Sequence, residues 1–94
     1  IRKWFDCDKI NCELTVRTRR SGDYMAVSQS GGHKKLTRCM IDDKIPGELR
    51  GKLPLVVDGN EVLWIVGGRI NERYKITSET GRVLEITYQG GNVQ

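Results

Sequence analysis

A turn tripeptide, Asp58-Gly59-Asn60, stands between two apolar runs, Leu55–Val57 and Glu61–Val66. Asp-Gly between strand-forming runs is a strong short-range signal for a β-hairpin, because glycine accepts the positive φ that a tight turn requires. Gly67-Gly68 follows the second run and ends it. The middle of this chain therefore predicts two antiparallel strands, and the rest of the chain must pack around them.

Short strand-like runs also occur on both sides of this hairpin. Leu14–Arg19 alternates apolar and polar residues, which predicts a strand. Its apolar residues, Leu14 and Val16, then share one face, and its arginines at positions 17 and 19 share the other. We expect further strands over Lys3–Asp6, Tyr24–Val27, Tyr74–Thr77 and Arg82–Tyr88, with the last two paired around a turn at Ser78–Gly81.

From Lys34 the period of the apolar residues changes to that of a helix. We expect this helix to end by Lys44, because a residue that precedes proline is pushed out of the helical region. The segment Pro46–Gly51 then predicts a second, short helix with proline at its first position. The stripe of the main helix consists of Leu36, Cys39, Met40 and Asp43.

Strands, one helical segment and strands again predict an α+β fold. We expect a small β-rich domain of mixed or antiparallel strands, with one main helix and a short second helix. A length of 94 residues suits one domain, residues 1–94. The first residue is Ile1 rather than methionine, so we interpret the chain as a fragment of a longer protein with a frayed polar tail at residues 89–94.

Three cysteines, an odd number, predict reduced thiols in a cytosolic protein rather than a disulfide framework. Together with His33 they would complete a zinc site. Structural zinc sites normally have two close ligand pairs, which Cys7, Cys12 and Cys39 do not supply. We therefore expect no bound metal, and cysteines that act as small buried hydrophobes. No apolar run approaches the roughly 18–20 residues of a membrane helix, so no membrane contact is expected.

Positive charge is concentrated in residues 17–52. This segment carries nine lysines and arginines against four acidic residues, for a net charge of +5. The rest of the chain sums to −1, so one segment holds the excess charge. Such asymmetry is typical of a face that binds a polyanion. An ordinary solvated surface is the alternative, and the clustering favours binding.

The glycine turn in this segment matches no complete nucleotide-binding loop. His33 follows Ser30-Gly31-Gly32, whereas a Walker loop needs lysine and then a hydroxyl residue after its last glycine. The SGGxDS loop of adenylating PP-loop enzymes is also absent. A glycine turn that opens a helix would offer free amides to an anion beside Lys34 and Lys35. A solvated helix start without a ligand is the alternative, and both interpretations stay open.

No catalytic group is predicted. The single histidine, His33, lies in a glycine loop, and no serine or cysteine occurs in a triad context. Asp42 and Asp43 are adjacent, so they point in different directions around a helix and are expected to pair locally with Arg38 or Lys44. These features argue against an independent enzyme such as a small metal-dependent hydrolase.

Arginines and one tyrosine are candidates for contact with a nucleic acid. On one strand face, Arg17 and Arg19 would lie about 6.5–7 Å apart along the chain, comparable to successive phosphates of a nucleic-acid strand. Trp64 lies in an apolar run and is expected in the core, whereas Tyr24 lies beside the basic turn. The patch would extend through three further basic residues, Arg20, Lys34 and Lys35.

Several short motifs follow one another between Leu14 and Thr77: RxRxxGD, a glycine loop, KKL, KIP with an arginine a few residues on, Pro-Leu, tryptophan, a Gly–Arg pair and a late lysine. In this order they resemble the C-terminal domain of bacterial tRNA(Ile)-lysidine synthetases. Tyr24, Gly51 and Gly68 depart from that pattern. The matching residues are Arg17, Arg19, Gly22, Asp23, Gly32, Lys34, Lys35, Leu36, Lys44, Ile45, Pro46, Arg50, Pro54, Leu55, Trp64, Gly67, Arg69 and Lys75.

The resemblance implies a PheT/TilS-like fold and a domain that holds tRNA(Ile) by its acceptor stem. It places the ATP, the magnesium and the attachment of lysine to the wobble cytidine in an N-terminal PP-loop domain of the same ligase, so this domain would need no cofactor. It also implies a cytoplasmic protein, with a homodimer of the parent enzyme as one arrangement. The alternative is an interdomain or dimerisation module without RNA contact.

The resemblance and the charge pattern together select the residues that we expect to contact tRNA. Asp23 is expected to brace the turn or to orient a nearby arginine. The predicted tRNA-binding residues are Arg17, Arg19, Lys34, Lys35, Arg38, Arg50 and Arg69, with Lys44, Lys75 and Tyr24 as further candidates.

Overall fold

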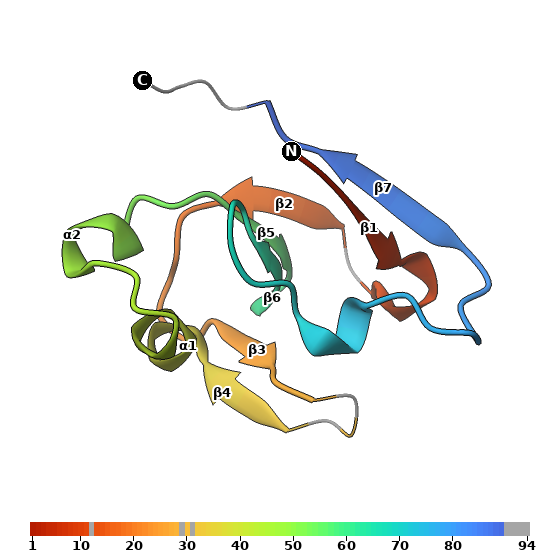
Figure 1. Ribbon diagram of the computed structural model, residues 1–94, viewed down its shortest axis with the longest axis horizontal. Helices are drawn as coiled ribbons and strands as arrows, with labels where there is room; N and C mark the ends of the chain where they lie inside the picture. Colours follow the sequence, from red (N-terminus) through yellow and green to blue (C-terminus); the bar gives the residue numbers. More distant parts are fainter. Residues whose placement is uncertain (12, 29, 31, 90–94) are drawn as a thin grey trace.

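The computed structural model describes residues 1–11, 13–28, 30 and 32–89. Within them, seven strands form a five-stranded sheet of order β2-β5-β6-β3-β4 and a separate ribbon of β1 and β7 (Figure 1). The strands are β1 (Arg2–Asp6), β2 (Leu14–Arg17), β3 (Tyr24–Ala26), β4 (His33–Lys35), β5 (Leu55–Asp58), β6 (Glu61–Ile65) and β7 (Val83–Thr87). The helices are α1 (Leu36–Asp42) and α2 (Gly47–Arg50), with 3-10 turns η1 (Cys7–Lys9) and η2 (Glu72–Tyr74).

The predicted hairpin is present and forms the centre of the molecule. β5 and β6 pair antiparallel, with Asp58 opposite Glu61 across the turn. Gly59 adopts a φ of 68°, the left-handed value that the turn requires. β3 pairs with β6 in parallel and with β4 antiparallel, so the sheet is mixed. The expected α+β architecture is confirmed.

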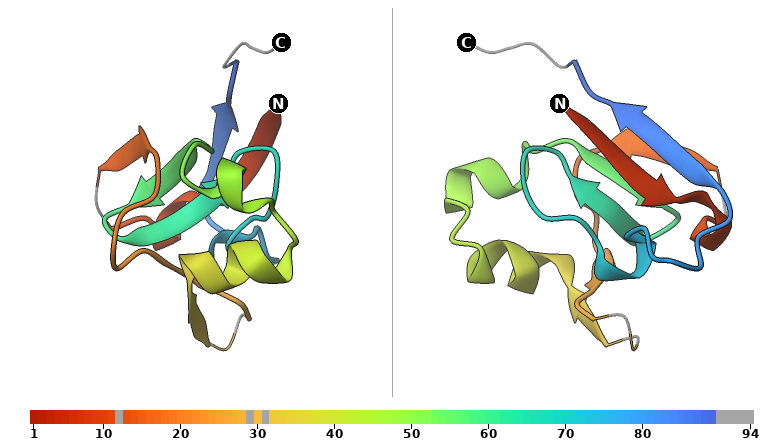
Figure 2. Two further views of the ribbon diagram at one scale, coloured as in Figure 1. Left: turned by 90° about the vertical axis from the view of Figure 1, so that its left-hand side faces the viewer. Right: turned by 45° about the vertical axis from the view of Figure 1, so that its right-hand side comes forward.

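The five-stranded sheet is covered by the helices on one side and by the β1–β7 ribbon on the other (Figure 2). Every residue of β5 and β6 is buried because both faces are covered. Leu55 and Val57 pack with the apolar face of α1. Val56 points the other way and packs with Phe5 of the ribbon and with Trp64. The predicted core position of Trp64 is confirmed.

The main helix begins two residues later than predicted. Lys34 and Lys35 belong to β4, where Lys35 pairs with Tyr24, and α1 starts at Leu36. Strand pairing overrides the helical period here, because the extended backbone of Lys35 completes the β3–β4 ladder. The glycine turn therefore does not open a helix, so both interpretations that placed a helix start at this turn are wrong.

Other features of the helical segment agree with the sequence in part. Leu36, Cys39 and Met40 of the predicted stripe are buried, whereas Asp43, its fourth member, is exposed at the end of the helix. The helix ends before Lys44, which adopts a positive φ of 60°. The expected second helix is present as α2, but it spans Gly47–Arg50, so Pro46 is its N-cap and not its first helical residue as predicted.

The predicted pairing of the last two strands is wrong. Residues 75–77 are not a strand, and β7 pairs antiparallel with β1 at the other end of the chain. η2 replaces the expected strand because the Asn71 side chain accepts a hydrogen bond from the Arg73 N–H at 2.8 Å. Tyr74 is fully buried, and its hydroxyl donates to Asp58 and Glu61. That contact holds the turn against the hairpin.

The structure also bears on the predictions for β2, the cysteines and the C-terminal tail. β2 ends at Arg17 rather than Arg19, and Val16 is 57% exposed on this edge strand instead of facing the core. Cys39 is buried, and burial raises the pKa of its thiol. Cys7 is half-buried; Cys12 and most of the tail expected at residues 89–94 lie outside the described residues. In the described part of the chain, no cluster of potential metal ligands occurs and no helix is long and apolar enough to cross a membrane.

Candidate nucleic-acid interface

A clamp between Arg17 and Asp23 organises the basic turn. Arg17 Nη2 donates to Asp23 Oδ1 at 2.8 Å, and Arg17 Nη1 donates to Asp23 Oδ2 at 2.9 Å. The Arg20 backbone N–H donates to the same Oδ2 at 2.7 Å. The two side chains are only 12% and 1% exposed, so this is a partly buried bidentate pair. The expectation that Asp23 braces the turn and orients an arginine agrees with this geometry.

Backbone hydrogen bonds attach this turn to the beginning of α1. The Leu36 N–H donates to the Asp23 carbonyl at 2.9 Å, and the Asp23 N–H donates to the Arg20 carbonyl at 3.3 Å. Gly22 adopts a φ of 90°, and an added Cβ would lie 3.1 Å from the Asn60 side-chain nitrogen. A side chain at Gly22 is therefore unfavourable, because of both the positive φ and the close approach to Asn60. The turn and the helix start form one fixed unit.

The protonation of Asp23 depends on two opposed effects. Burial disfavours its charged form, but hydrogen bonds from Arg17 and from the Arg20 backbone outweigh burial, so the pKa of Asp23 lies below its ordinary value. A carboxyl whose pKa falls on folding binds fewer protons in the folded state. Its contribution to the free energy of unfolding is complete above the unfolded pKa and disappears as the pH falls through the folded pKa.

We expect Asp23→Asn to have its full destabilising effect above about pH 4 and a shrinking effect in stronger acid. The measurement is the free energy of unfolding of both proteins by urea, at a series of pH values from neutral downward. A difference between the two proteins that stays constant throughout the acid range would contradict the assignment of the low pKa to Asp23.

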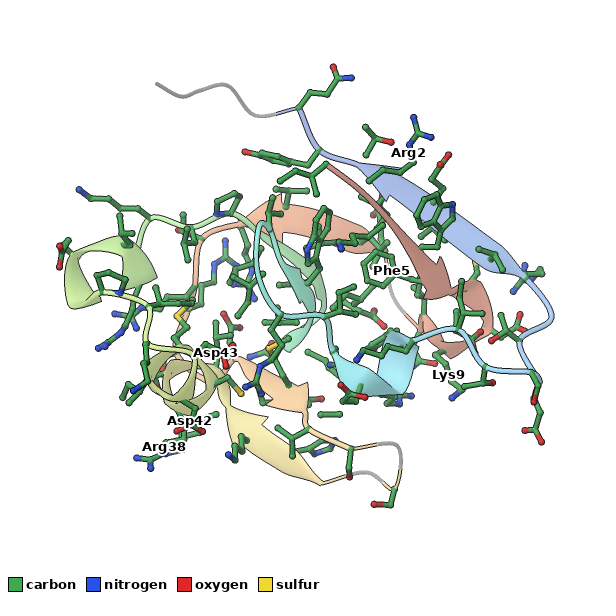
Figure 3. The ribbon with its side chains drawn as sticks, in the orientation of Figure 1. Arg2, Phe5, Lys9, Arg38, Asp42 and Asp43 are labelled. Carbon is green, nitrogen blue, oxygen red and sulfur yellow. The ribbon has the colours of Figure 1, made fainter. Side chains whose placement is uncertain are left out.

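Most of the predicted tRNA-binding cations already have carboxylate partners. Figure 3 shows Arg38 beside Asp42 on α1, pointing away from the body of the molecule. Lys34 donates to the other oxygen of Asp42 at 2.8 Å, which lowers the pKa of that carboxyl. The ion pairs are Arg17 with Asp23, Lys34 and Arg38 with Asp42, Arg69 with Asp43, and Lys75 with Glu72.

These pairs differ in how readily they can exchange a carboxylate for a phosphate. The pairs of Asp42 and Glu72 are exposed, and exposed pairs are worth little, so their cations can turn to another anion. The Arg17 guanidinium is held in a buried fork and is committed to the clamp. We therefore interpret Arg17 as a positioning residue rather than a surface contact. Arg19 lies beyond the end of β2, so the two arginines do not share a strand face as predicted.

Three of the exposed cations without such a partner lie around one hollow. None of the ion pairs formed within the described ranges involves Arg19, Arg20 or Lys35. All three line a hollow of about 460 Å³ between the turn and α1. The hydroxyl residues Ser21 and Thr37 line it as well. From the sequence, Arg20 was predicted only as an extension of the basic patch, and the two hydroxyl residues were not predicted. The feature that could have identified them is their position, in the RRSGD turn and directly after KKL.

The other predicted residues lie elsewhere. Lys44 lines a separate hollow of about 320 Å³ with the apolar residues of the α1–α2 connection. Arg50 is near it in sequence, and its Nε donates to the Ile45 carbonyl at 2.9 Å. Tyr24 is half-buried, with its ring centroid 5.0 Å from that of His33. From the predicted set, the structure thus brings Arg19 and Lys35 together at the hollow, and Lys34 and Arg38 together at Asp42. The remaining predicted residues do not join either group.

Comparison with known proteins identifies the family. The sequence model of the TilS substrate C-terminal domain matches residues 14–86. The chain belongs to this family. The crystal structure of a TilS C-terminal domain superposes with a TM-score of 0.67 and 33% identity, covering 87% of this chain and 65% of that one. The family resemblance expected from the ordered motifs is confirmed.

Longer relatives of this TilS domain are tRNA(Ile)-lysidine synthases. The protein from Caldanaerobacter subterraneus subsp. tengcongensis is 44% identical over 86 residues, covering 92% of this chain and 18% of the relative. The protein from Clostridium tetani is 43% identical over 88 residues, covering 94% and 19%. That from Dehalococcoides mccartyi is 40% identical over 86 residues, covering 92% and 18%. The chain spans about a fifth of the length of these curated relatives.

Proposed function

We propose that this domain binds tRNA(Ile) by its acceptor stem and positions it for a lysidine synthase. The observation that carries the proposal is the group of three unpaired cations, Arg19, Arg20 and Lys35, around one hollow. A second pair of exposed cations, Lys34 of β4 and Arg38 of α1, meets at Asp42. The family membership and the names of the relatives support tRNA as the polyanion.

Double-stranded RNA is a suitable partner for such a face. An A-form helix offers proteins mainly its phosphates and 2′-hydroxyls, so it is recognised by shape and charge rather than by base edges. Arginine, lysine and hydroxyl side chains match these groups. The aromatic residues contribute less, since Trp64 is fully buried and the Tyr24 ring packs against His33.

The chemistry would then belong to another part of a longer protein. Among the described residues, the carboxylates Asp42 and Asp43 are tied to cations, and His33 packs on Tyr24. These described residues form no pair of nucleophile and general base. In this proposal the ATP, the magnesium and the wobble cytidine bind in an N-terminal catalytic domain, in the cytoplasm, and this domain needs no cofactor.

Charge reversal at two unpaired cations should weaken tRNA binding. We expect Arg20→Glu/Lys35→Glu to reduce affinity for tRNA(Ile) about tenfold or more, because a hydrogen bond to a charged group is worth roughly 1.5–3 kcal/mol. The slope of log affinity against log salt should fall by about 1 for each lost phosphate contact. The measurement is fluorescence anisotropy of labelled tRNA(Ile) across a series of salt concentrations.

Lys9→Glu is a suitable control, because Lys9 lies at the opposite end of the molecule from Arg38 (Figure 3). It should leave both the affinity and the slope close to those of the wild type. Lys34→Glu is less informative, since it would also place two acids together at Asp42. If Arg20→Glu/Lys35→Glu and Lys9→Glu bind tRNA equally well, the basic face is not the tRNA contact.

One observation favours the second candidate function, an interdomain or dimerisation module. Trp4 and Val83, 48% and 53% exposed, belong to the two paired strands of the ribbon. Exposed apolar groups of this kind are frequent where proteins associate. A homodimer at micromolar concentration in analytical ultracentrifugation, abolished by Trp4→Ser, would support this role if the domain also shows no affinity for tRNA.

A further inference from the structure

The hollow between the basic turn and α1 has the donor groups of an anion site. Arg19, Arg20 and Lys35 contribute two guanidinium groups and one ammonium group, and Ser21 and Thr37 contribute hydroxyls. Guanidinium and ammonium groups form charge-assisted hydrogen bonds with phosphate oxygens. Three like charges around one concave surface also repel one another, so an anion bound between them is favourable.

The acidic residue on the lining does not cancel this charge. Asp23 also lines the hollow, but its side chain is 1% exposed. Both of its oxygens already accept hydrogen bonds, from Arg17 and from the Arg20 backbone. The negative charge of Asp23 is therefore used inside the clamp, and the surface open to solvent presents the three cations.

The hollow has room for more than a bare ion. Its volume of about 460 Å³ lies within the range of roughly 300–1,000 Å³ found for small-molecule sites. Its walls are also fixed in position, because the Leu36 N–H bonds to the Asp23 carbonyl and Lys35 pairs with Tyr24. A phosphate and part of the attached sugar can therefore enter a site that is already formed.

We propose that this hollow is a discrete phosphate-binding site, in which Arg20 and Lys35 hold a single phosphate group of an RNA strand. Arg19 lies on the same lining and adds positive charge, while Ser21 and Thr37 donate hydroxyl hydrogen bonds. The site deepens the proposed function and rests on it for the identity of the ligand as RNA. Phosphate chemistry itself can be tested without tRNA.

The first experiment uses inorganic phosphate as the probe. Amide chemical shifts of the 15N-labelled chain are followed during a phosphate titration, with chloride added to keep the ionic strength constant. We expect saturable shifts confined to residues 19–23 and 35–37. Arg20→Gln/Lys35→Gln should weaken phosphate binding about tenfold or more, and Lys9→Gln should leave it unchanged. Ser21→Ala/Thr37→Val retains every charge and should give a smaller loss.

The second experiment distinguishes two sources of the phosphate. Short RNA duplexes with a 5′-hydroxyl or a 5′-phosphate are titrated into the same labelled chain. Shifts of the same residues with both duplexes would identify a backbone diester as the ligand, whereas shifts with the 5′-phosphate duplex alone would identify a terminal monoester. Either result supports a phosphate site.

The absence of localised shifts with inorganic phosphate and with both duplexes would overturn the site. The proposed function is judged separately, by the tRNA affinity of Arg20→Glu/Lys35→Glu. A loss of tRNA affinity without localised phosphate shifts would leave tRNA binding in place and reject the discrete site. Localised phosphate shifts with unchanged tRNA affinity would retain the site and reject the proposed role of this face.

Discussion

Asp23→Ala is expected to lower the free energy of unfolding by about 3 kcal/mol, the low end of the cost of removing one partner from a buried ion pair, because the Arg17–Asp23 pair is partly buried. The Arg17 guanidinium would remain 12% exposed with no carboxylate opposite its fork. The Arg20 N–H would also lose its acceptor. Urea unfolding followed by circular dichroism measures the effect, which should be accompanied by weaker tRNA binding because the turn carries Arg20.

Asp43→Ala is the matched control for this prediction. Asp43 also accepts two hydrogen bonds from an arginine, Arg69, but both side chains are about a third exposed. Water can replace the lost partner there, so we expect a cost below about 1 kcal/mol. Equal losses of stability in Asp23→Ala and Asp43→Ala would show that the clamp is no more than a surface pair.

Phe5→Ala is expected to cost about 3–5 kcal/mol, the usual range for deleting a buried phenylalanine ring. Phe5 is fully buried, and its ring centroid lies 6.0 Å from that of Trp64 (Figure 3). Through this contact β1 attaches the ribbon to the five-stranded sheet. Residue 5 precedes the part of the chain that the family model matches, residues 14–86. The prediction therefore tests whether β1 is an integral part of the domain.

Trp4→Ala provides the comparison for Phe5, since the two residues are neighbours on one strand and Trp4 is 48% exposed. A substitution on an exposed face is expected to change stability by about 0.5 kcal/mol. Urea unfolding of both variants gives the difference. A small effect of Phe5→Ala, no larger than that of Trp4→Ala, would mean that the ribbon contributes little to the stability of the sheet.

Features that depend on neighbouring residues were predicted well from the sequence. The hairpin followed from Asp58-Gly59-Asn60 between two apolar runs, and its turn forms with Gly59 at positive φ. The buried stripe of α1 followed from helical spacing, and the break before Pro46 followed from proline sterics. Turn chemistry and side-chain period act within about ten residues, so they can be read locally.

Features that depend on distant partners were predicted poorly. The strand at Arg82–Tyr88 was predicted with Tyr74–Thr77 as its partner, but β7 pairs with β1 near the other end of the chain. The predicted helix began at Lys34, but the pairing of Lys35 with Tyr24 places both lysines in a strand. In both cases, tertiary hydrogen bonding decided between local conformations of similar energy.

The same distinction applies to the candidate site. The sequence by itself determined that residues 17–52 hold the positive charge, that Asp23 belongs to a turn, and that the family is that of TilS C-terminal domains. Only the tertiary structure decided which cations are available to a ligand. Arg69 meets an acid 26 residues away, and Arg17 is partly buried against Asp23, whereas Arg20 and Lys35 share an open hollow. Charge is a property of composition, but its neutralisation depends on distances of a few ångströms between atoms that only folding brings together.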